Sequence, residues 1–161
     1  MHKPHLLLNR LADAGVEFVV VGDYAAVFHG SEYFTNGLEV CAVLSAENTG
    51  RIRAALGDLH PVHRQTHKRL SFIDHPAPGQ ELLNLYLETD DGIIDILSSI
   101  LGVGDFARLK ERAVEVPLFG RKCAVISLED LIAAKEAVGR ERNLLTVKEL
   151  RAIAAKRAQK E

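Results

Sequence analysis

Two carboxylates lie inside strongly apolar segments of this sequence and are the first candidates for chemistry. Glu39 falls in the segment 38–44, and Asp95 falls in the segment 93–97. A charge within so apolar a strand is costly unless it is paired, hydrogen-bonded or bound to a metal ion. Two carboxylates on neighbouring strands could hold a divalent ion together, because Mg²⁺ prefers oxygen ligands. The sequence therefore indicates a candidate acidic site at Glu39 and Asp95, provided that their strands are neighbours.

A glycine turn is the second candidate feature. Gly22 and Asp23 follow the apolar run 18–21 and open a short helical segment. Backbone N–H groups at such a turn could approach a phosphate group, so both residues are candidates for nucleotide binding. The Asp23 carboxylate favours the helix dipole but would repel a triphosphate unless a cation lies between them. We expect Glu39 and Asp95 to converge near Gly22.

The same residues also have purely structural explanations. Asp95 could be a strand-end carboxylate that is hydrogen-bonded to a turn. Glu39 could form an ion pair with Lys68 or Arg69. Gly22 could be required by the geometry of the turn alone. The sequence leaves these alternatives open.

Alternating helix and strand signals surround the candidate residues, without an internal repeat. Apolar spacing and capping residues predict helices at about 7–14, 23–28, 46–56, 105–113 and 127–138, and a last helix that contains 146–149. Short apolar or β-branched runs predict strands at 18–21, 38–44, 69–74, 81–88, 93–97, 114–118 and 123–126. The predicted fold is α/β, more narrowly α+β: a mixed β-sheet flanked by helices, with a helical carboxyl end.

Two strand pairs are expected from the turns between them. The segments 69–74 and 81–88 flank a turn rich in proline and glycine and should form a hairpin. The segments 114–118 and 123–126 should form a small peripheral pair.

Four residues predict where particular helices begin and end. Ser45 is a plausible N-cap, and Ser127 opens a capping-box pattern that ends at Asp130. Gly15 and Gly139 are expected to terminate the helices that precede them.

Length and composition indicate one soluble domain. The chain has 161 residues, of which 47% are hydrophobic and 26% are charged, as is usual for a globular protein with a real core. We expect a core over about 1–126 and a helical segment over about 127–161. No run approaches the roughly 20 apolar residues that span a bilayer, and the amino terminus has no secretory signal, so a cytoplasmic location without membrane association is expected. Cys41 and Cys123 are expected to be reduced and buried.

The carboxyl end is basic although the whole chain has a formal charge of −2. Residues 135–161 carry 8 basic and 4 acidic groups. The basic side chains that could touch phosphates are Lys148, Arg151, Lys156, Arg157 and Lys160. A solvated helix face is the simpler interpretation, because a pI near 6.4 lacks the strongly basic signature of nucleic-acid-binding proteins.

Other chemically suggestive residues have simple structural interpretations. His60, His63 and His67 lie in one loop without cysteine partners and are expected to be surface histidines. Tyr24 and Phe28 are four residues apart and are expected to be core residues of the short helix.

Taken together, several short segments resemble the nucleotidyltransferases of the DNA polymerase beta superfamily, and in particular the small type related to toxin-antitoxin systems. The similar residues extend over nearly the whole chain: Val21-Gly22 with Tyr24-Ala25, His29-Gly30, Thr35 followed by Glu39, Gly92 to Ile96 around Asp95, and Leu128 to Ile132 with Lys135 and Gly139-Arg140. Their order and spacing carry the resemblance, because no single motif is specific.

The resemblance implies metal-dependent transfer of a nucleotidyl group from an NTP to a hydroxyl acceptor. It further implies three carboxylates that hold two Mg²⁺ or Mn²⁺ ions, at the positions of Gly37, Glu39 and Asp95. Gly37 has no side chain to offer as a ligand, Glu39 is one methylene longer than aspartate, and Asn143 stands where the resemblance implies another acid. Metal ions are needed to neutralise the triphosphate and stabilise the leaving pyrophosphate, so the active-site motifs are degenerate.

Two functions are consistent with these observations. The first is a metal-dependent nucleotidyltransferase with an atypical site, in which Glu39 and Asp95 hold one ion and Gly22 approaches the phosphates of an NTP. The second is a catalytically inactive binding or regulatory module of the same fold, with a toxin-antitoxin-type protein partner or RNA.

Overall fold

The fold is built on a mixed sheet, as the sequence predicts. The computed structural model describes residues 3–32 and 37–160, so Thr35 lies outside the described residues. A seven-stranded sheet has the order β3-β4-β5-β2-β1-β9-β8. Its strands are β1 (Val19–Val21), β2 (Gly37–Cys41), β3 (Val62–His63), β4 (Asn84–Thr89), β5 (Gly92–Leu97), β8 (Val114–Leu118) and β9 (Arg121–Val125). A separate two-stranded ribbon pairs β6 (Ser99–Ile100) with β7 (Gly104–Asp105).

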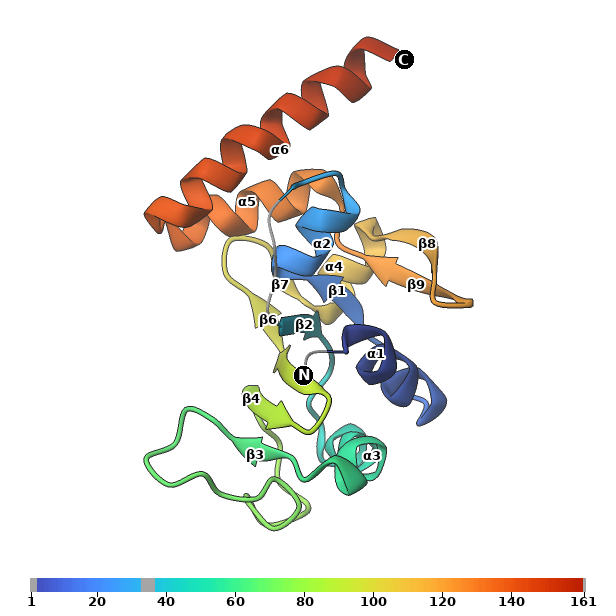
Figure 1. Cartoon of the computed structure of the whole chain (residues 1–161), viewed down its shortest axis with the longest axis vertical. Helices are drawn as coiled ribbons and strands as arrows, with labels where there is room; N and C mark the ends of the chain where they lie inside the picture. Colours follow the sequence, from blue (N-terminus) through green and yellow to red (C-terminus); the bar gives the residue numbers. More distant parts are fainter. Residues whose placement is uncertain (1–2, 33–36, 161) are drawn as a thin grey trace.

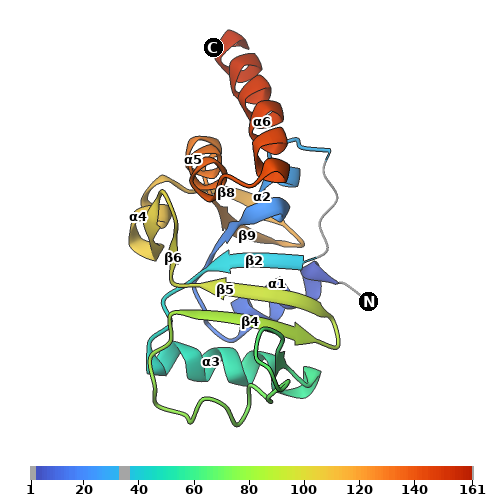
Figure 2. The same cartoon turned by 90° about the vertical axis from the view of Figure 1, so that its left-hand side faces the viewer.

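The helices cover the sheet and one end of it (Figures 1 and 2). They are α1 (Pro4–Asp13), α2 (Gly22–Phe28), α3 (Ala46–Leu56), the 3-10 turn η1 (Gly57–Leu59), α4 (Phe106–Arg112), α5 (Leu128–Val138) and α6 (Glu141–Lys160). Helix α1 packs against α3 and β2, whereas α5 packs against α2 and α6. In both views α6 extends beyond the rest of the molecule.

Strand alternation assigns the two faces of the central strands. Leu38 and Val40 on β2 and Ile94 and Ile96 on β5 are completely buried or nearly so in the hydrophobic core. Side chains of neighbouring positions point the opposite way, toward a cleft. The core therefore fixes which face of β2 and β5 presents polar groups.

The predicted caps are present. The Ser45 hydroxyl accepts a hydrogen bond from the N–H of Asn48, and the Ser127 hydroxyl accepts one from the N–H of Asp130. Gly139 ends α5 in the left-handed conformation at φ +71°. The predicted last helix is α6, which contains the segment 146–149 in its interior.

The hairpin predicted between 69–74 and 81–88 is wrong. The partner of β4 on that side is β3, and the segment 69–74 contributes only an isolated bridge at Ser71. The Arg53 guanidinium on α3 donates hydrogen bonds to the carbonyls of Phe72 and Pro76. These bonds hold the segment as a loop over α3 and compete with ladder pairing.

Two smaller expectations also need correction. The strands β8 and β9 pair at one edge of the sheet, as predicted, but the pair is not separate from the sheet, because β9 also pairs in parallel with β1. Tyr24 packs against the core as expected. Phe28 is 37% exposed and contacts the His29 ring edge-on, so it is not a core residue.

Helix α6 is attached to α2 and its following loop by polar contacts. The Ser31 hydroxyl and the Glu32 N–H both donate to the Glu149 carboxylate. The buried His29 ring lies 2.7 Å through Nε2 from the carbonyl oxygen of Ile126, and Arg157 Nη1 lies 3.3 Å from its Nδ1. Because the carbonyl can only accept, His29 Nε2 donates and Nδ1 accepts from Arg157.

This arrangement predicts a loss of stability on mild acidification. Burial lowers the pKa of His29, the nearby Arg157 charge lowers it further, and the Ile126 carbonyl and Glu129 oppose the shift. As the pH falls, the unfolded chain therefore binds a proton at His29 at a higher pH than the folded chain does. The free energy of unfolding consequently decreases as the pH falls below about 6.5, the pKa of histidine in the unfolded chain. We expect the melting temperature to fall less between about pH 7.5 and pH 5 in His29→Gln than in the wild type.

Melting curves of both proteins across this range provide the measurement. The comparison with wild type is needed because Asp90 raises the pKa of His60. Protonation of His60 therefore increases the stability of the folded chain as the pH falls, which is opposite to the effect of His29. Parallel pH profiles for the two proteins would contradict the assignment to His29.

Among the residues that the structure describes, no helix combines the length and the apolar character needed to cross a membrane.

Candidate active-site cleft

The sheet register brings the two predicted carboxylates together. Strands β2 and β5 run parallel, and Glu39 is the direct partner of Asp95. On the other side of β2, Glu39 is paired with Val21, the residue before the glycine turn. The structure thus places Glu39, Asp95 and Gly22 in one place, as the strand alternation suggested.

Gly22 is in close contact with the Glu39 carboxylate. Its backbone has φ +68°, and a Cβ atom added there would lie 2.1 Å from Glu39 Oε2. Glycine is therefore required at this position for two reasons. The backbone is in the left-handed conformation, and the Glu39 carboxylate occupies the space that a Cβ atom would need. Turn geometry alone does not account for this glycine.

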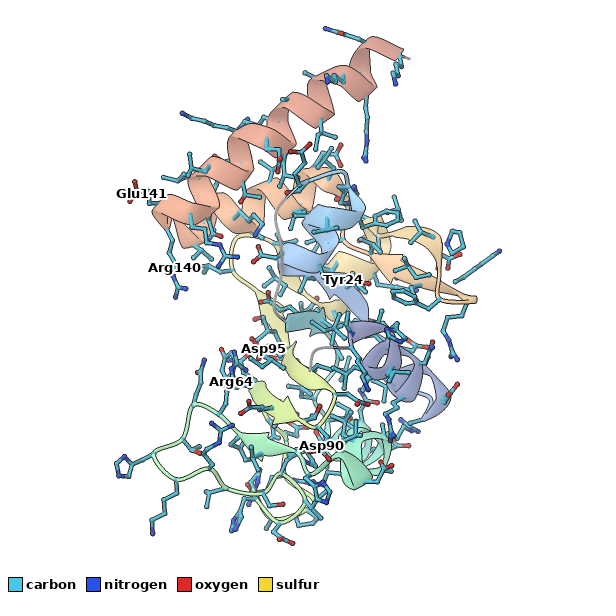
Figure 3. All side chains as sticks on the ribbon, in the orientation of Figure 1. Tyr24, Arg64, Asp90, Asp95, Arg140 and Glu141 are labelled. Atoms are coloured by element: carbon cyan, nitrogen blue, oxygen red, sulfur yellow. The ribbon has the colours of Figure 1, made fainter. Side chains whose placement is uncertain are left out.

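Asp95 is held by an arginine that the sequence did not single out. Arg64 follows β3 and reaches both carboxylate oxygens, with 2.9 Å between Nη2 and Oδ2. Its guanidinium also lies over the Tyr86 ring, with Cζ 5.6 Å from the ring centroid. Figure 3 shows Arg64 and Asp95 side by side. Asp95 is therefore not bound to a turn, as the structural alternative proposed, but forms a bidentate ion pair.

Asp23 joins α2 to the carboxyl-terminal helices. Its Oδ1 accepts a hydrogen bond from Lys135 Nζ at 2.7 Å, and its Oδ2 accepts one from Arg142 Nη2 at 2.8 Å. The Lys135 side chain is only 8% exposed. Lys135 and Arg142 are therefore cations beside Asp23 of the kind expected from the sequence, which predicted that Asp23 would repel a triphosphate without one.

Glu39 is the carboxyl group with the most perturbed surroundings in the cleft. Burial raises its pKa above the ordinary value, and the Asp95 charge adds to this effect, as does Asp23. The charges of Lys135 and Arg64 lower the same pKa. The predicted pairing of Glu39 with Lys68 or Arg69 is wrong, since Arg69 pairs with Glu88. The cations that act on Glu39 are Lys135 and Arg64, which line the same cleft.

These side chains line a cavity of about 660 Å³. Its lining is mixed, and its polar and charged residues include Asp23, Glu39, Arg64, Tyr86, Asp95, Lys135, Arg140 and Arg142. Its apolar residues include Leu97, Ile100, Leu101, Leu131, Ala134 and Val138. Leu101 is 66% exposed and Val138 is 46% exposed, so part of the apolar lining is open to solvent. A second hollow of about 290 Å³ shares Asp23, Glu39, Arg64, Asp95 and Arg142.

The residues present do not fit the two-ion site that the resemblance implies. Within the described ranges 3–32 and 37–160, no group of three or more His, Cys, Asp or Glu side chains is arranged to hold a metal ion. Gly37 has no carboxylate, and a guanidinium occupies both oxygens of Asp95. The histidines His60 and His63 are engaged elsewhere, with Asp90 and with the His75 carbonyl.

Sequence reasoning identified the acidic half of the site and missed the role of the basic half. The sequence pointed to Lys135 only as part of the tail segment that resembles the nucleotidyltransferases, and it gave no role to Arg142. Arg64 lies in a loop without periodicity, so no local pattern marks it. The tail segment around Lys135 and Arg140 was the available signal, since it places one cation in the last turn of α5 and the other in the connection between α5 and α6.

Several solved structures that resemble this fold are described as nucleotidyltransferases or adenylylating enzymes. The lincosamide antibiotic adenylyltransferase LnuA, in its lincomycin-bound form, superposes with a TM-score of 0.64 at 15% identity, covering 95% of this chain and 98% of that one. A candidate nucleotidyltransferase from Thermotoga maritima gives 0.54 at 20% identity, covering 92% and 94%. ANT(2″)-Ia in complex with adenylyl-2″-tobramycin gives 0.50 at 12% identity, covering 92% and 95%. No protein-family model matches the sequence, and a search of curated proteins found no match.

This chain therefore has the nucleotidyltransferase fold. The sequence identities are too low to carry substrates or residue roles from these proteins to this one. What the chain does must be argued from its own cleft.

Proposed function

We propose that this protein binds a nucleoside triphosphate in the cleft and does not carry out divalent-metal-dependent nucleotidyl transfer. The ancestral chemistry of the fold is transfer of a nucleotidyl group from an NTP to a hydroxyl acceptor. The observation that carries the proposal is the bidentate pair between Arg64 and Asp95. Asp95 is the only aspartate among the three expected metal-ligand positions, and both of its carboxylate oxygens are bound to Arg64.

The shape and chemistry of the cleft support a nucleotide as the ligand. Its lining combines four cations, Arg64, Lys135, Arg140 and Arg142, with three carboxylates. The apolar side chains of the same lining are suited to contact with a ring system. LnuA is an adenylyltransferase and ANT(2″)-Ia was solved with an adenylylated antibiotic, so nucleotide chemistry is the first chemistry to test for this cleft.

A second candidate function is retained because of one observation. Glu39 and Asp95 are direct partners on adjacent strands, so the two carboxylates together could hold one Mg²⁺ or Mn²⁺ ion if Arg64 moved aside. This candidate is a nucleotidyltransferase with an atypical site, with Gly22 and Asp23 at the nucleotide.

No specific contact favours RNA or a toxin-antitoxin partner. Two of the basic side chains predicted to face phosphates, Arg151 and Arg157, are engaged within the protein with Glu136 and His29. A regulatory role through a macromolecular partner therefore stays a prediction of the resemblance.

Calorimetric titration of each NTP, in EDTA and in Mg²⁺ or Mn²⁺, tests the proposal. We expect binding in EDTA, no dependence on the metal ion, and no release of pyrophosphate on incubation with NTP. Asp95→Ala should keep NTP binding in EDTA, because no metal ion on Asp95 is needed and Tyr86 still holds Arg64 through its carbonyl and its ring. Metal-dependent binding that disappears in Asp95→Ala would support the second candidate. A folded protein that binds no NTP under either condition would refute nucleotide binding altogether.

A further inference from the structure

Three cationic side chains from distant parts of the chain line the cleft. Arg64 comes from the loop after β3, Lys135 from the last turn of α5, and Arg142 from the first turn of α6. Figure 3 shows Arg64 on the same side of the molecule as Arg140, which is two residues before Arg142 in the chain. Each of the three is held by a carboxylate of the protein itself, so their positions do not depend on a ligand.

Arg64 is held by Tyr86 as well as by its ion pair with Asp95. Its backbone N–H donates to the Tyr86 carbonyl at 3.0 Å, and its guanidinium lies over the Tyr86 ring. Its end-on pair with Asp95 uses two of the five N–H donors of a guanidinium. The remaining donors lie on Nε and on the outer edges of the group. A guanidinium fixed in this way can contact a carboxylate and a phosphate at once.

Bridging a carboxylate to phosphate oxygens is what a divalent ion does in phosphoryl chemistry. An arginine supplies a single positive charge and a planar fork that matches two phosphate oxygens. It stabilises bound phosphate but provides no coordination site for an attacking hydroxyl. The presence of Arg64 at Asp95 thus favours binding without transfer.

Lys135 and Arg142 extend the same positive surface. They share the Asp23 carboxylate, one on each oxygen, so one negative charge is divided between two cations. The bond to Asp23 uses one of the three donors of the Lys135 ammonium group. Glu39, the third carboxyl group of this lining, is not paired with either cation by an ion pair within the described residues.

We propose that Arg64 takes the place of the divalent ion and, with Lys135 and Arg142, forms a metal-independent binding site for a polyphosphate group. This inference rests on the proposed function and assigns the recognition of the nucleotide to its phosphates. Asp95 and Asp23 hold the cations in place when the ligand is absent and remain their partners when it binds.

Titration of inorganic tripolyphosphate in EDTA tests this site without a nucleoside. We expect the wild type to bind it and Arg64→Met to bind it about 10- to 100-fold more weakly, the loss typical of a charge-assisted bidentate contact. Lys135→Met should also weaken binding. Arg51→Met is the matched control, because Arg51 forms an exposed pair with Glu47 on α3 and lies outside the cleft. Arg64→Lys should recover only part of the affinity, since lysine keeps the charge and loses the fork.

The double variant Arg64→Met/Asp95→Asn guards against misfolding. It removes the cation without leaving a half-buried carboxylate unpaired, and it should show the same loss of affinity with a melting temperature close to that of the wild type. Equal tripolyphosphate affinity in this variant and in Arg51→Met would overturn the assignment, as would binding that appears only with Mg²⁺.

Titration of the same variants with NTP separates the two proposals. If NTP binds to the wild type and to Arg64→Met equally well and tripolyphosphate does not bind, the phosphate site is wrong and nucleotide binding stands. If neither ligand binds, both proposals fail.

Discussion

Gly22→Ala is expected to destabilise the protein strongly. The new methyl group would lie 2.1 Å from Glu39 Oε2 and about 3 Å from two further atoms of the same side chain. The left-handed backbone at this position adds about 1 to 2 kcal/mol for any residue with a Cβ. Displacing the partly buried Glu39 side chain adds a further loss of about 1 to 3 kcal/mol, typical of overpacking. Chemical denaturation of the variant and the wild type measures the sum.

The chain contains a matched control for the backbone part of this effect. Gly15 has φ +79°, and a Cβ atom added there would meet nothing within 4 Å. Gly15→Ala should therefore show the conformational cost alone. The excess loss in Gly22→Ala over Gly15→Ala isolates the collision with Glu39.

A double-mutant cycle identifies the colliding group. Glu39→Ala removes the carboxylate, so Gly22→Ala should cost much less in that background than in the wild type. An equal cost in both backgrounds would show that Glu39 is not packed against Gly22. This result would also remove the geometric basis for placing Glu39 in the cleft.

The second large effect is a gain of metal-dependent nucleotide binding when the acidic positions are restored. The variant combines Gly37→Asp and Glu39→Asp, which supply the missing and the altered carboxylates, with Arg64→Met, which releases Asp95. Asp23→Ser removes a negative charge at the turn. We expect NTP affinity at least about 100-fold higher with Mg²⁺ than in EDTA, since even second-shell changes at metal sites alter affinity by about 10- to 100-fold.

The structure has room for the new carboxylate. A Cβ atom at Gly37 would lie 3.1 Å from Ile93 Cγ2, a side chain that can shift by a few tenths of an ångström, and the backbone there is not left-handed. Calorimetry with NTP and Mg²⁺ is the measurement. The same variant with Gly37 kept is the control and should show a weaker metal dependence. A restored variant that folds and shows no metal dependence would count against the mapping of Gly37, Glu39 and Asp95 onto a metal site.

Local patterns in the sequence were sufficient for most of the elements. The helices at 46–56 and 127–138 have the predicted bounds to within a residue, because a capping serine marks each start. The strand predicted at 69–74 is wrong, because only Phe72 of its large apolar residues is buried, and Arg53 of α3 lies over the Phe72 ring and donates to the carbonyls of Phe72 and Pro76. Periodicity reports that a segment is apolar, and it does not report which element covers it.

The acidic half of the cleft was also predictable, and the basic half was not. The sequence alone determined which face of β2 and β5 carries Glu39 and Asp95, since side chains alternate along a strand and the apolar set must face the core. Only the tertiary structure decided that Arg64 pairs with Asp95, and that Lys135 and Arg142 pair with Asp23. These partners are 31, 112 and 119 residues apart in the chain. An ion pair between distant segments leaves no periodic signal in the sequence, because it depends on where the packed core places the ends of its elements.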